Sequence, residues 1–359
     1  MRHLTRLAAT VAAGLLVVTV PGPASAAPDD LSGGWLTRQL TDGLVHNDQY
    51  GFDDYGLTAD TAFALAAIGG NRAHLDDIGT ALAGKVDSWT TGVDWGSDDV
   101  YAGSVAKAVV VAQVTRVGAR DFGGVDLVQR LNGRVSQTAP HVGRIEDQTA
   151  GTDYANTIGQ AFAARGLARA RSGKADEAVR FLLKQQCREG YFRLNFAPKA
   201  NKKQGCDAGT AADSSPDTDV TALAVLSLDA LPKKARTKAV RAAVADATAW
   251  LKRAQKKNGS LGGGTVTEAS NANSTGLAAW ALGETGSCTK ARKAARWVRA
   301  LQVRGDVSGT PLAGEKGGIA YDRAAFESAQ VDGIATEERD QWRRATTQAA
   351  PGLRHLSCG

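Results

Sequence analysis

Apolar and polar positions along the chain define two kinds of helical segment. In the first kind, a short polar residue precedes a run dense in Ala, Leu and Val that is apolar on nearly every side. Ala and Leu favour helix, Ser, Thr, Asp or Asn caps its first turn, and a helix that is apolar all round is buried. We expect such buried helices in segments that begin at Tyr55, Tyr101, Asp153, Ser215, Ser270 and Ala320.

The second kind of segment carries Lys and Arg on one face and apolar residues on the other, as surface helices do. These amphipathic helices are predicted at 127–135, 175–186, 237–255 and 289–302, with a last one near 337–348. The pair recurs roughly every 50 residues, which gives about six helix pairs. Because the first and last units resemble the others, the repeat is predicted to close on itself rather than form an open solenoid with polar ends.

The pattern therefore predicts an all-α fold, an α/α toroid with the buried helices as an inner ring. The amphipathic helices would form the outer ring, completed by the segment near 337–348. A composition of 43% hydrophobic and 22% charged residues excludes a wholly disordered chain and a multi-span membrane protein. The net charge of +6 is modest and no basic run stands out, so we expect no nucleic-acid partner.

The first 26 residues are typical of a secretory signal peptide. Arg2 and Arg6 precede an apolar run at 7–20, and Ala24-Ser25-Ala26 offers a cleavage site. The run is shorter than the roughly 20 apolar residues of a membrane span. We therefore expect a mature toroid domain of residues 27–359 that is secreted and extracellular, monomeric and without a membrane span.

Four cysteines lie in the mature part, and an even count in an exported chain favours disulfides. Three pairings are possible. We favour Cys187–Cys206, which flank one loop, and Cys288–Cys358, which would tie the last segment to the body. With scattered histidines and no C-x-x-C motif, we expect neither a metal site nor a cofactor.

The ends of several amphipathic helices share one further pattern, an aromatic-aliphatic pair and a Gln, followed by Gly and an aromatic or aliphatic residue. Copies occur at 181–192, 250–261 and 297–319, with a looser one at 35–52. This pattern resembles the repeat of the prenyltransferase and squalene/terpene cyclase superfamily, and the chain looks most like its small secreted bacterial members. The resemblance implies the same α/α toroid, a fold that binding proteins such as cobalamin carriers also use.

The resemblance supplies only incomplete catalytic motifs. Class II cyclases protonate their substrate with the middle aspartate of Asp-x-Asp-Asp, and the nearest match is Asp217-Thr218-Asp219-Val220, which lacks the last aspartate. Asp217 and Asp219 are thus the catalytic candidates. The alternative is that both cap a helix, as Asp60 and Asn273 would in their units. The magnesium motif of class I enzymes and the zinc set of protein prenyltransferases are incomplete as well.

A ring of polar residues is predicted at one mouth of the toroid, because every inner helix should begin there. Carboxylates at helix N-termini stay ionised, and with tyrosines as stacking surfaces they would suit a cationic or polyhydroxylated ligand. The alternative is a set of independent caps without a shared ligand. Trp95 and Trp280 could line the same region or belong to the core, and the loop at 190–215 could be a disulfide-pinned surface loop or a lid. The candidate ligand-binding residues are Asp54, Tyr55, Asp99, Tyr101, Asp153, Tyr154, Tyr321 and Asp322.

These observations favour a non-catalytic function, the binding of an extracellular small molecule or envelope component at an acidic-aromatic mouth. The alternative is a terpenoid cyclase or prenyltransferase-like enzyme that uses Asp217 and Asp219. Such an enzyme would require a deep apolar cavity of several hundred cubic ångströms that reaches those aspartates.

Overall fold

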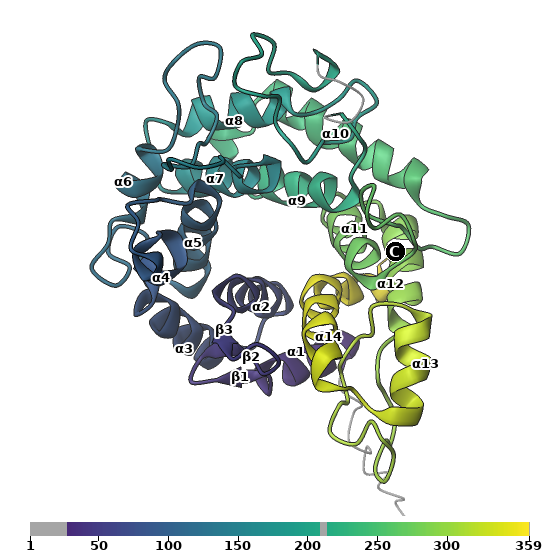
Figure 1. Cartoon of the computed structure of the whole chain (residues 1–359). Helices are drawn as coiled ribbons and strands as arrows, with labels where there is room; N and C mark the ends of the chain where they lie inside the picture. Colours follow the sequence, from purple (N-terminus) through teal and green to yellow (C-terminus); the bar gives the residue numbers. More distant parts are fainter. Residues whose placement is uncertain (1–26, 209–213, 359) are drawn as a thin grey trace, which may run out of the picture.

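The structure is a computed structural model that describes residues 27–208 and 214–358, so the signal peptide predicted at 1–26 lies outside the described residues. Two concentric rings of helices surround a common axis (Figure 1). The inner helices contact one another in sequence and the last returns to the first, which closes the ring. In order, they are α2 (Tyr55–Ile68), α5 (Ala102–Thr115), α7 (Thr157–Arg169), α9 (Thr218–Asp229), α11 (Ala272–Glu284) and α14 (Thr336–Ala349).

Most of the outer helices pack in the grooves between neighbouring inner helices. For example, α3 contacts both α2 and α5, and α10 contacts both α9 and α11. This arrangement of inner and outer helices confirms the predicted all-α toroid. The outer ring contains α1 (Pro28–Thr37), α3 (Arg72–Ala83), α6 (Leu127–Asn132), α8 (Ala175–Lys184), α10 (Lys238–Ala254) and α12 (Cys288–Arg299).

Short elements connect the two rings. A small antiparallel sheet in the order β1-β2-β3 joins α1 to α2 and comprises β1 (Leu40–Thr41), β2 (Leu44–Asn47) and β3 (Phe52–Asp53). The remaining elements are α4 (Val86–Thr90), α13 (Arg323–Asp332) and the 3-10 helices η1 (Val93–Trp95), η2 (Cys206–Ala208), η3 (Lys233–Ala235) and η4 (Ala350–Ser357).

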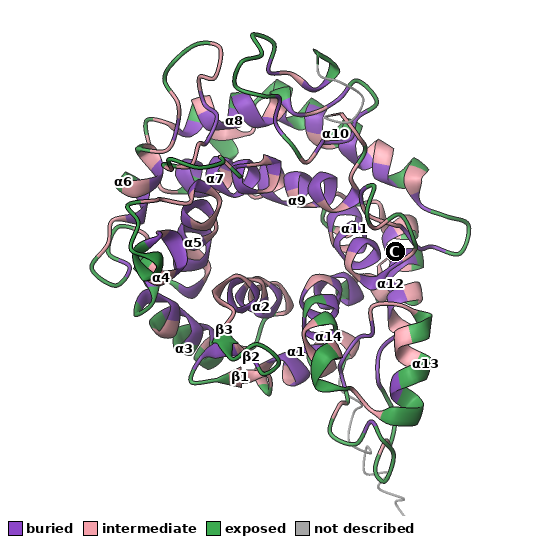
Figure 2. Ribbon diagram, in the orientation of Figure 1, coloured by how far each residue is buried: buried purple, intermediate pink, exposed green. Residues whose placement is uncertain are grey.

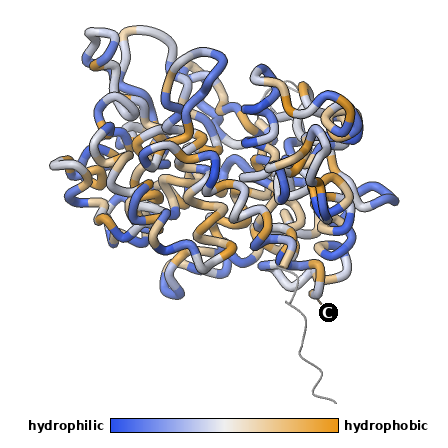
Figure 3. Tube along the Cα trace, turned by 90° about the horizontal axis from the view of Figure 1, so that it is seen from below, coloured by the Kyte–Doolittle hydropathy of each residue, from blue (hydrophilic) through white to orange (hydrophobic). Residues whose placement is uncertain are grey.

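The inner helices are largely buried, whereas exposure concentrates on the outer helices and loops (Figure 2). Hydrophobic residues accordingly lie between the two ends of the toroid, and hydrophilic residues dominate the end loops (Figure 3). Small side chains let the inner helices approach closely. A Cβ on Gly276 of α11 would overlap the Cα atom of Ala349 in α14. None of the helices in the described parts of the chain combines the length and hydrophobicity needed to cross a bilayer.

One hydrogen bond recurs where an outer-helix loop meets the next inner helix. A backbone N–H after the loop donates to a threonine hydroxyl of that helix, which satisfies a buried donor. The threonine lies in the first turn of α2, α9 and α11, but near the C-terminal end of α14. Four copies have N···O distances of 2.9 to 3.0 Å: Val45 to Thr58, Phe192 to Thr221, Leu261 to Thr275 and Ile319 to Thr346. The Thr346 copy identifies α14 as an inner helix.

The sequence assignment of the last two helices was therefore wrong. The segment that begins at Ala320 forms α13, which lies outside the inner ring and buries only Ala329. The segment near 337–348, predicted as an outer helix, forms the inner helix α14, which packs between α11 and α2. Its many charged residues concealed a narrow buried face that contains Trp342, Ala345 and Ala349, spaced by three and four residues.

A Gln that recurs at the ends of several outer helices joins each of these helices to the next one. At the end of α10, Gln255 donates to the carbonyls of Gly259 (3.0 Å) and of Lys290 in α12 (2.9 Å). At the end of α12, Gln302 donates to the carbonyl of Pro28 in α1 (2.7 Å). The contact that closes the outer ring, between α12 and α1, is thus of the same type as the contact between α10 and α12.

Both favoured disulfides are present. Cys187 pairs with Cys206, with their Cα atoms 5.0 Å apart, and Cys288 pairs with Cys358 at 5.1 Å. The first disulfide joins the segment after α8 to the start of η2, within the described part of the long loop, of which 209–213 is outside the described residues. The second ties the end of η4 to the start of α12, beside the first outer helix, since η4 contacts both α1 and α12.

Candidate functional site

The two ends of the toroid are chemically different. The C-terminal ends of α2, α7, α9 and α11 line one cavity, so these helices run in the same direction and their N-termini face the opposite end. We call that opposite end the mouth. It is the end where the sequence places its candidate ligand-binding residues.

Most candidate carboxylates at the mouth already have partners. Asp54 caps α2 by accepting a hydrogen bond from the N–H of Leu57 (2.7 Å), and it forms an ion pair with Arg344. Asp322 caps α13 (2.9 Å to the N–H of Ala325), which lies outside the inner ring. At Asp54 the charge that a cationic ligand would meet is therefore already paired, and Asp322 belongs to a helix outside the inner ring.

A carboxylate that the sequence analysis did not single out brings two of the candidate tyrosines together. Asp147 accepts hydrogen bonds from the N–H groups of Ala102 (2.7 Å) and Tyr154 (2.9 Å). It thereby caps α5 in place of Tyr101, whose side chain makes no capping bond. Burial raises the pKa of Asp147, although both N–H groups oppose the rise. The side chain of Asp147 thus joins the segment that contains Tyr101 to the segment that contains Tyr154.

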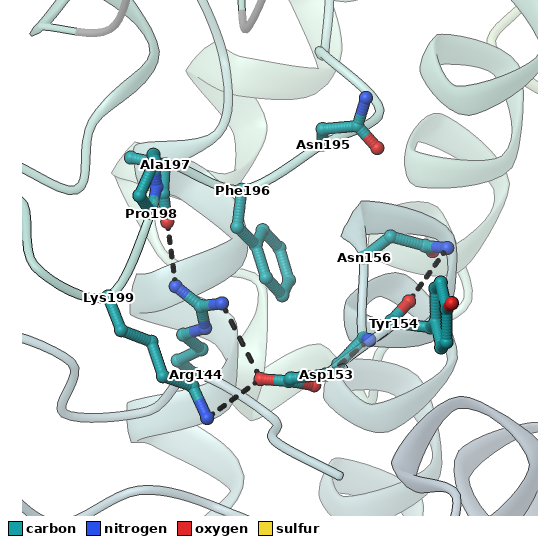
Figure 4. Close-up of a pocket in the computed structure, with 10 residues that line it drawn as sticks. Arg144, Asp153, Tyr154, Asn156, Asn195, Phe196, Ala197, Pro198 and Lys199 are labelled. Atoms are coloured by element: carbon teal, nitrogen blue, oxygen red, sulfur yellow. Dashed lines mark hydrogen bonds and ion pairs between the residues drawn. The ribbon is translucent and has the colours of Figure 1, made fainter. Parts of the chain in front are cut away.

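Beside this junction lies a cavity of about 460 Å³ that we call the loop pocket (Figure 4). Its walls come from the segment before α7 and from the loop that follows α8, with Arg144 between them. The lining residues are Arg144, Asp153, Tyr154, Ala155, Asn156, Asn195, Phe196, Ala197, Pro198 and Lys199. Of the candidate ligand-binding residues, the loop pocket contains Asp153 and Tyr154.

The charges of the loop pocket are balanced. Asp153 pairs with Lys199 (2.9 Å) and Arg144 (3.6 Å), as Figure 4 shows. Lys199 also pairs with Glu146 (3.4 Å), so two cations face two carboxylates. Burial opposes ionisation of Asp153, but hydrogen bonds from the N–H of Asp147 and from Lys199 outweigh it and lower its pKa. Arg144 also donates to the carbonyl of Ala197 (2.9 Å) and stacks over Phe196, with its guanidinium 4.9 Å from the ring centroid. The result is a rigid, neutral polar wall.

An exposed aromatic side chain stands opposite this wall. Tyr154 is 78% exposed, which is unusual for an aromatic residue so close to a cavity. The side chains of Asn156 and Asn195 lie nearby (Figure 4), and Asn156 caps α7 by accepting hydrogen bonds from the N–H groups of Ile158 and Gly159. Amide groups and a free aromatic face around a neutral cavity suit a ligand that carries several hydroxyl groups.

Asp217 and Asp219, the catalytic candidates, play different parts. Asp217 caps α9, accepting hydrogen bonds from the N–H groups of Asp219 (2.9 Å) and Val220 (3.0 Å). Asp219 makes no such cap, and its buried Oδ1 has no hydrogen-bond partner in the described structure. Burial raises the pKa of Asp219 to about 6; the nearby Ser274 hydroxyl opposes this rise and Asp217 adds to it.

Two further buried oxygens have no hydrogen-bond partner among the described residues. They are the Oδ1 atom of Asn273 and the Oγ atom of Ser274, both on the neighbouring helix α11. The side chain of Tyr321 stands close enough to Asp219 for the carboxylate to raise its pKa, after burial. We call Asp219, Ser274 and Tyr321 the Asp219 cluster. The glycine-rich turn at 262–264 packs against it, since a Cβ on Gly263 would lie 3.0 Å from Oγ of Ser274.

Four other candidates belong to neither the loop pocket nor the Asp219 cluster. Asp60 and Asn273 are inside their helices and do not cap them; Asp60 forms an ion pair with Lys107 (2.8 Å), and Asn271 caps α11 instead. Trp95 is 81% exposed on η1, and Trp280 lines the cavity at the end opposite the mouth. In the described residues, no group of three or more His, Cys, Asp or Glu side chains is arranged to hold a metal ion.

Comparison with solved structures identifies the class of fold. The unsaturated glucuronyl hydrolase of Bacillus sp. GL1, responsible for the degradation of glycosaminoglycan, superposes with a TM-score of 0.58 at 11% identity, covering 92% of this chain and 95% of that one. The type II terpene cyclase MstE from Scytonema gives 0.61 at 14% identity, covering 92% and 98%. No family model and no curated protein sequence matches the chain.

The protein is thus an α/α toroid, and its predicted resemblance to the terpene cyclase repeat superfamily is confirmed at the level of the fold. At these identities, the likeness extends to the fold alone. The same architecture carries sugar chemistry in one neighbour and terpenoid chemistry in the other, so the function must be argued from the residues of this chain.

Of the ten residues that line the loop pocket, the sequence candidates include only Asp153 and Tyr154. Arg144 lies in a connection without periodicity, as does Asp147 beside the pocket, and Asn195 and Phe196 lie in the long loop between the first two cysteines. The one available signal was the length of that loop, because long loops in a compact domain are often functional.

Proposed function

We propose that the protein is exported and binds a polyhydroxylated small molecule, or a saccharide of the cell envelope, in the loop pocket. The observation that carries this proposal is the combination of a 460 Å³ cavity with balanced charge and the exposed ring of Tyr154 at its edge. Sugar rings stack on aromatic faces, and their hydroxyl groups pair with amide and charged side chains that are held in place.

Export is supported by the signal-like segment of residues 1–26 and by two disulfides, which form in oxidising compartments. The fold adds compatible support, since a solved neighbour with the same toroid acts on glycosaminoglycan. The ion pairs of Asp54 and Asp153 weigh against a cationic ligand and leave the polyhydroxylated class as the better match.

The test is a saccharide-binding measurement with matched tyrosine variants. The mature protein is applied to an array of bacterial envelope saccharides and glycosaminoglycan fragments, and hits are measured by titration calorimetry. We expect Tyr154→Ala to weaken binding about 10-fold by removing the stacking surface. Tyr50, which is 71% exposed and outside the loop pocket, provides the control Tyr50→Ala, which should bind like the wild type. Absence of saccharide binding, or equal affinity of both variants, would refute the proposal.

The Asp219 cluster favours one second candidate, an acid-catalysed reaction of the terpenoid cyclase or prenyltransferase-like kind. A carboxyl group with a pKa near 6 is partly protonated at neutral pH and can donate a proton, which such a reaction requires. Mass spectrometry of molecules that co-purify from culture medium, and of products from squalene or geranylgeranyl diphosphate, tests it. A cyclised product that disappears in Asp219→Asn would establish this activity, and an unchanged substrate would rule it out for these compounds.

A further inference from the structure

A second cavity, of about 600 Å³, lies at the end of the toroid opposite the mouth. We call it the basal cavity. The C-terminal ends of α2, α7, α9 and α11 form its walls, and Arg236 and Arg354 stand at its edges. Its volume is within the range of small-molecule sites, and it shares no residue with the loop pocket or the Asp219 cluster.

Arg165 of α7 lines the basal cavity without an internal partner. Its Nε atom is inaccessible to solvent and forms no hydrogen bond in the described structure. Burial, together with the charge of Arg169 one turn further along α7, lowers the pKa of Arg165 to about 10. The guanidinium is therefore still charged at neutral pH. The side chain of Arg165 is partly exposed, but its Nε atom is removed from solvent. A charge that is partly removed from water and has no counterion is unfavourable, so its retention requires an explanation.

The carboxylates of the basal cavity do not compensate Arg165. Asp229 pairs with Arg236 (3.4 Å), and Glu284 pairs with Arg354 (3.9 Å). Across residues 27–208 and 214–358, neither Arg165 nor Arg169 forms an ion pair within 4.0 Å. The cavity thus holds two arginine charges in excess of its acidic groups.

The helix dipole does not supply the missing partner. C-terminal ends of helices carry partial negative charge, which favours a nearby cation. However, this effect acts through the last free carbonyls, and the buried Nε of Arg165 donates to none of them. The remaining walls are apolar, with Trp280, Leu226 and Ile68 among them. The excess positive charge and the unpartnered Nε of Arg165 therefore lie beside an apolar part of the wall, an arrangement that suits an anion with an apolar body.

We propose that the basal cavity binds an organic anion whose carboxylate, sulfate or phosphate group is held by Arg165 and Arg169. The planar guanidinium pairs with two oxygens of such a group at once, an arrangement that lysine does not reproduce. The body of the ligand packs against Trp280, Leu226 and Ile68, so it is aromatic or aliphatic rather than a bare inorganic ion. This site is independent of the saccharide site at the mouth.

Phenyl phosphate, benzoate, inorganic phosphate and phenol serve as probes in titration calorimetry and thermal unfolding of the mature protein. We expect saturable binding of phenyl phosphate or benzoate at millimolar or lower concentration, with a rise in Tm. Inorganic phosphate should bind at least 10-fold more weakly than the organic anions because it lacks the apolar body. Phenol should also bind at least 10-fold more weakly because it lacks the charge. Absence of saturable binding by both organic anions would overturn the proposal.

Two methionine variants separate a binding role from a structural one. Arg165→Met keeps an apolar stem but removes the charge, and it should weaken organic-anion binding at least 10-fold. Without ligand, its Tm should equal or exceed that of the wild type because an unpaired charge that is partly removed from water is lost. Arg296→Met, at an exposed position on α12, is the matched control and should bind normally.

Two further results would contradict the proposal. A clear fall in the Tm of ligand-free Arg165→Met would show that Arg165 serves the fold. If that variant does not fold, Arg169→Met provides the same binding test, and unchanged anion affinity there would also refute the site. Tyr154→Ala should bind the organic anions like the wild type. A wrong assignment of the anion site in the basal cavity can therefore be distinguished from a wrong assignment of the saccharide site in the loop pocket.

Discussion

Closure of the toroid depends on Gly317, and replacing it tests the architecture directly. Gly317 has a φ of +103°, and a Cβ there would overlap the carbonyl oxygen of Leu31 and lie 2.6 Å from its carbonyl carbon. Leu31 belongs to α1, the first outer helix, whereas Gly317 follows α12. The variant Gly317→Ala therefore forces the two ends of the outer ring apart.

The cost has two parts. A left-handed backbone alone costs alanine about 1 to 2 kcal/mol. Moving α1 also strains the hydrogen bonds from Ser32 to the Gly317 carbonyl (2.7 Å) and from Gln302 to the Pro28 carbonyl (2.7 Å), each with a net contribution of about 1 kcal/mol. We expect Gly317→Ala to lower the free energy of unfolding by about 3 to 4 kcal/mol in total.

Gly118 provides a control with nearly the same backbone. Its φ is +101°, and a Cβ there would meet no atom within 4 Å. Gly118→Ala should therefore cost only the backbone part, about 1 to 2 kcal/mol. Urea unfolding followed by circular dichroism, with disulfides intact and midpoints compared at equal m, measures both. Equal losses in the two variants would show that Gly317 does not pack against α1 and that the ring is not closed there.

Three further changes have defined outcomes. Burial raises the pKa of Asp219 in the folded state to about 6, so the folded state holds the proton of this carboxyl group more tightly than the unfolded state does. The free energy of unfolding should therefore fall by up to about 3 kcal/mol as pH rises from about 4 to about 6. Asp219→Asn should abolish that slope in urea titrations; an unchanged slope would contradict the assignment. Replacing Cys288 and Cys358 by alanine opens a loop of 70 residues and should lower the free energy of unfolding by about 4 kcal/mol. Removing the Cys187–Cys206 disulfide, which spans 19 residues, should lower it by about 3 kcal/mol; the reverse order in urea unfolding would contradict the entropic argument. Thr346→Val leaves a buried N–H unpaired and should cost about 1 to 3 kcal/mol, whereas no measurable loss would argue against α14 as an inner helix.

The fold was largely predictable because its inner helices are apolar on every side. The segments that begin at Tyr55 and Ser270 illustrate this, since Ala and Leu runs with polar caps have few alternatives to burial. Prediction failed at the last pair because α14 is rich in charge. Its burial relies on partners distant in sequence: Arg343, for example, pairs with Asp48 (3.2 Å) and donates to the carbonyl of His46.

The candidate site was less predictable, for a physical reason. The capping role of Asp54 follows from local sequence, but its pairing with Arg344 depends on ring closure and therefore on the whole fold. Likewise, the motif search pointed to Asp219, yet only the packing of α9 against α11 reveals that its Oδ1 atom has no partner. The sequence identified residue types at helix starts, whereas charge balance and unpaired buried atoms required three dimensions.

The contact between the first outer helix and the loop after α12 also has a kinetic consequence. Ser32 bonds to Gly317, which follows it by 285 residues, so α1 lacks its final neighbour until nearly all of the chain has been made. At ribosomal rates of about 5 to 20 residues per second, this delay is roughly 15 to 60 seconds. Throughout that interval the apolar faces around Trp35 and Leu57 are open to other molecules. The newly synthesised polypeptide should therefore aggregate readily unless a chaperone shields its leading segment.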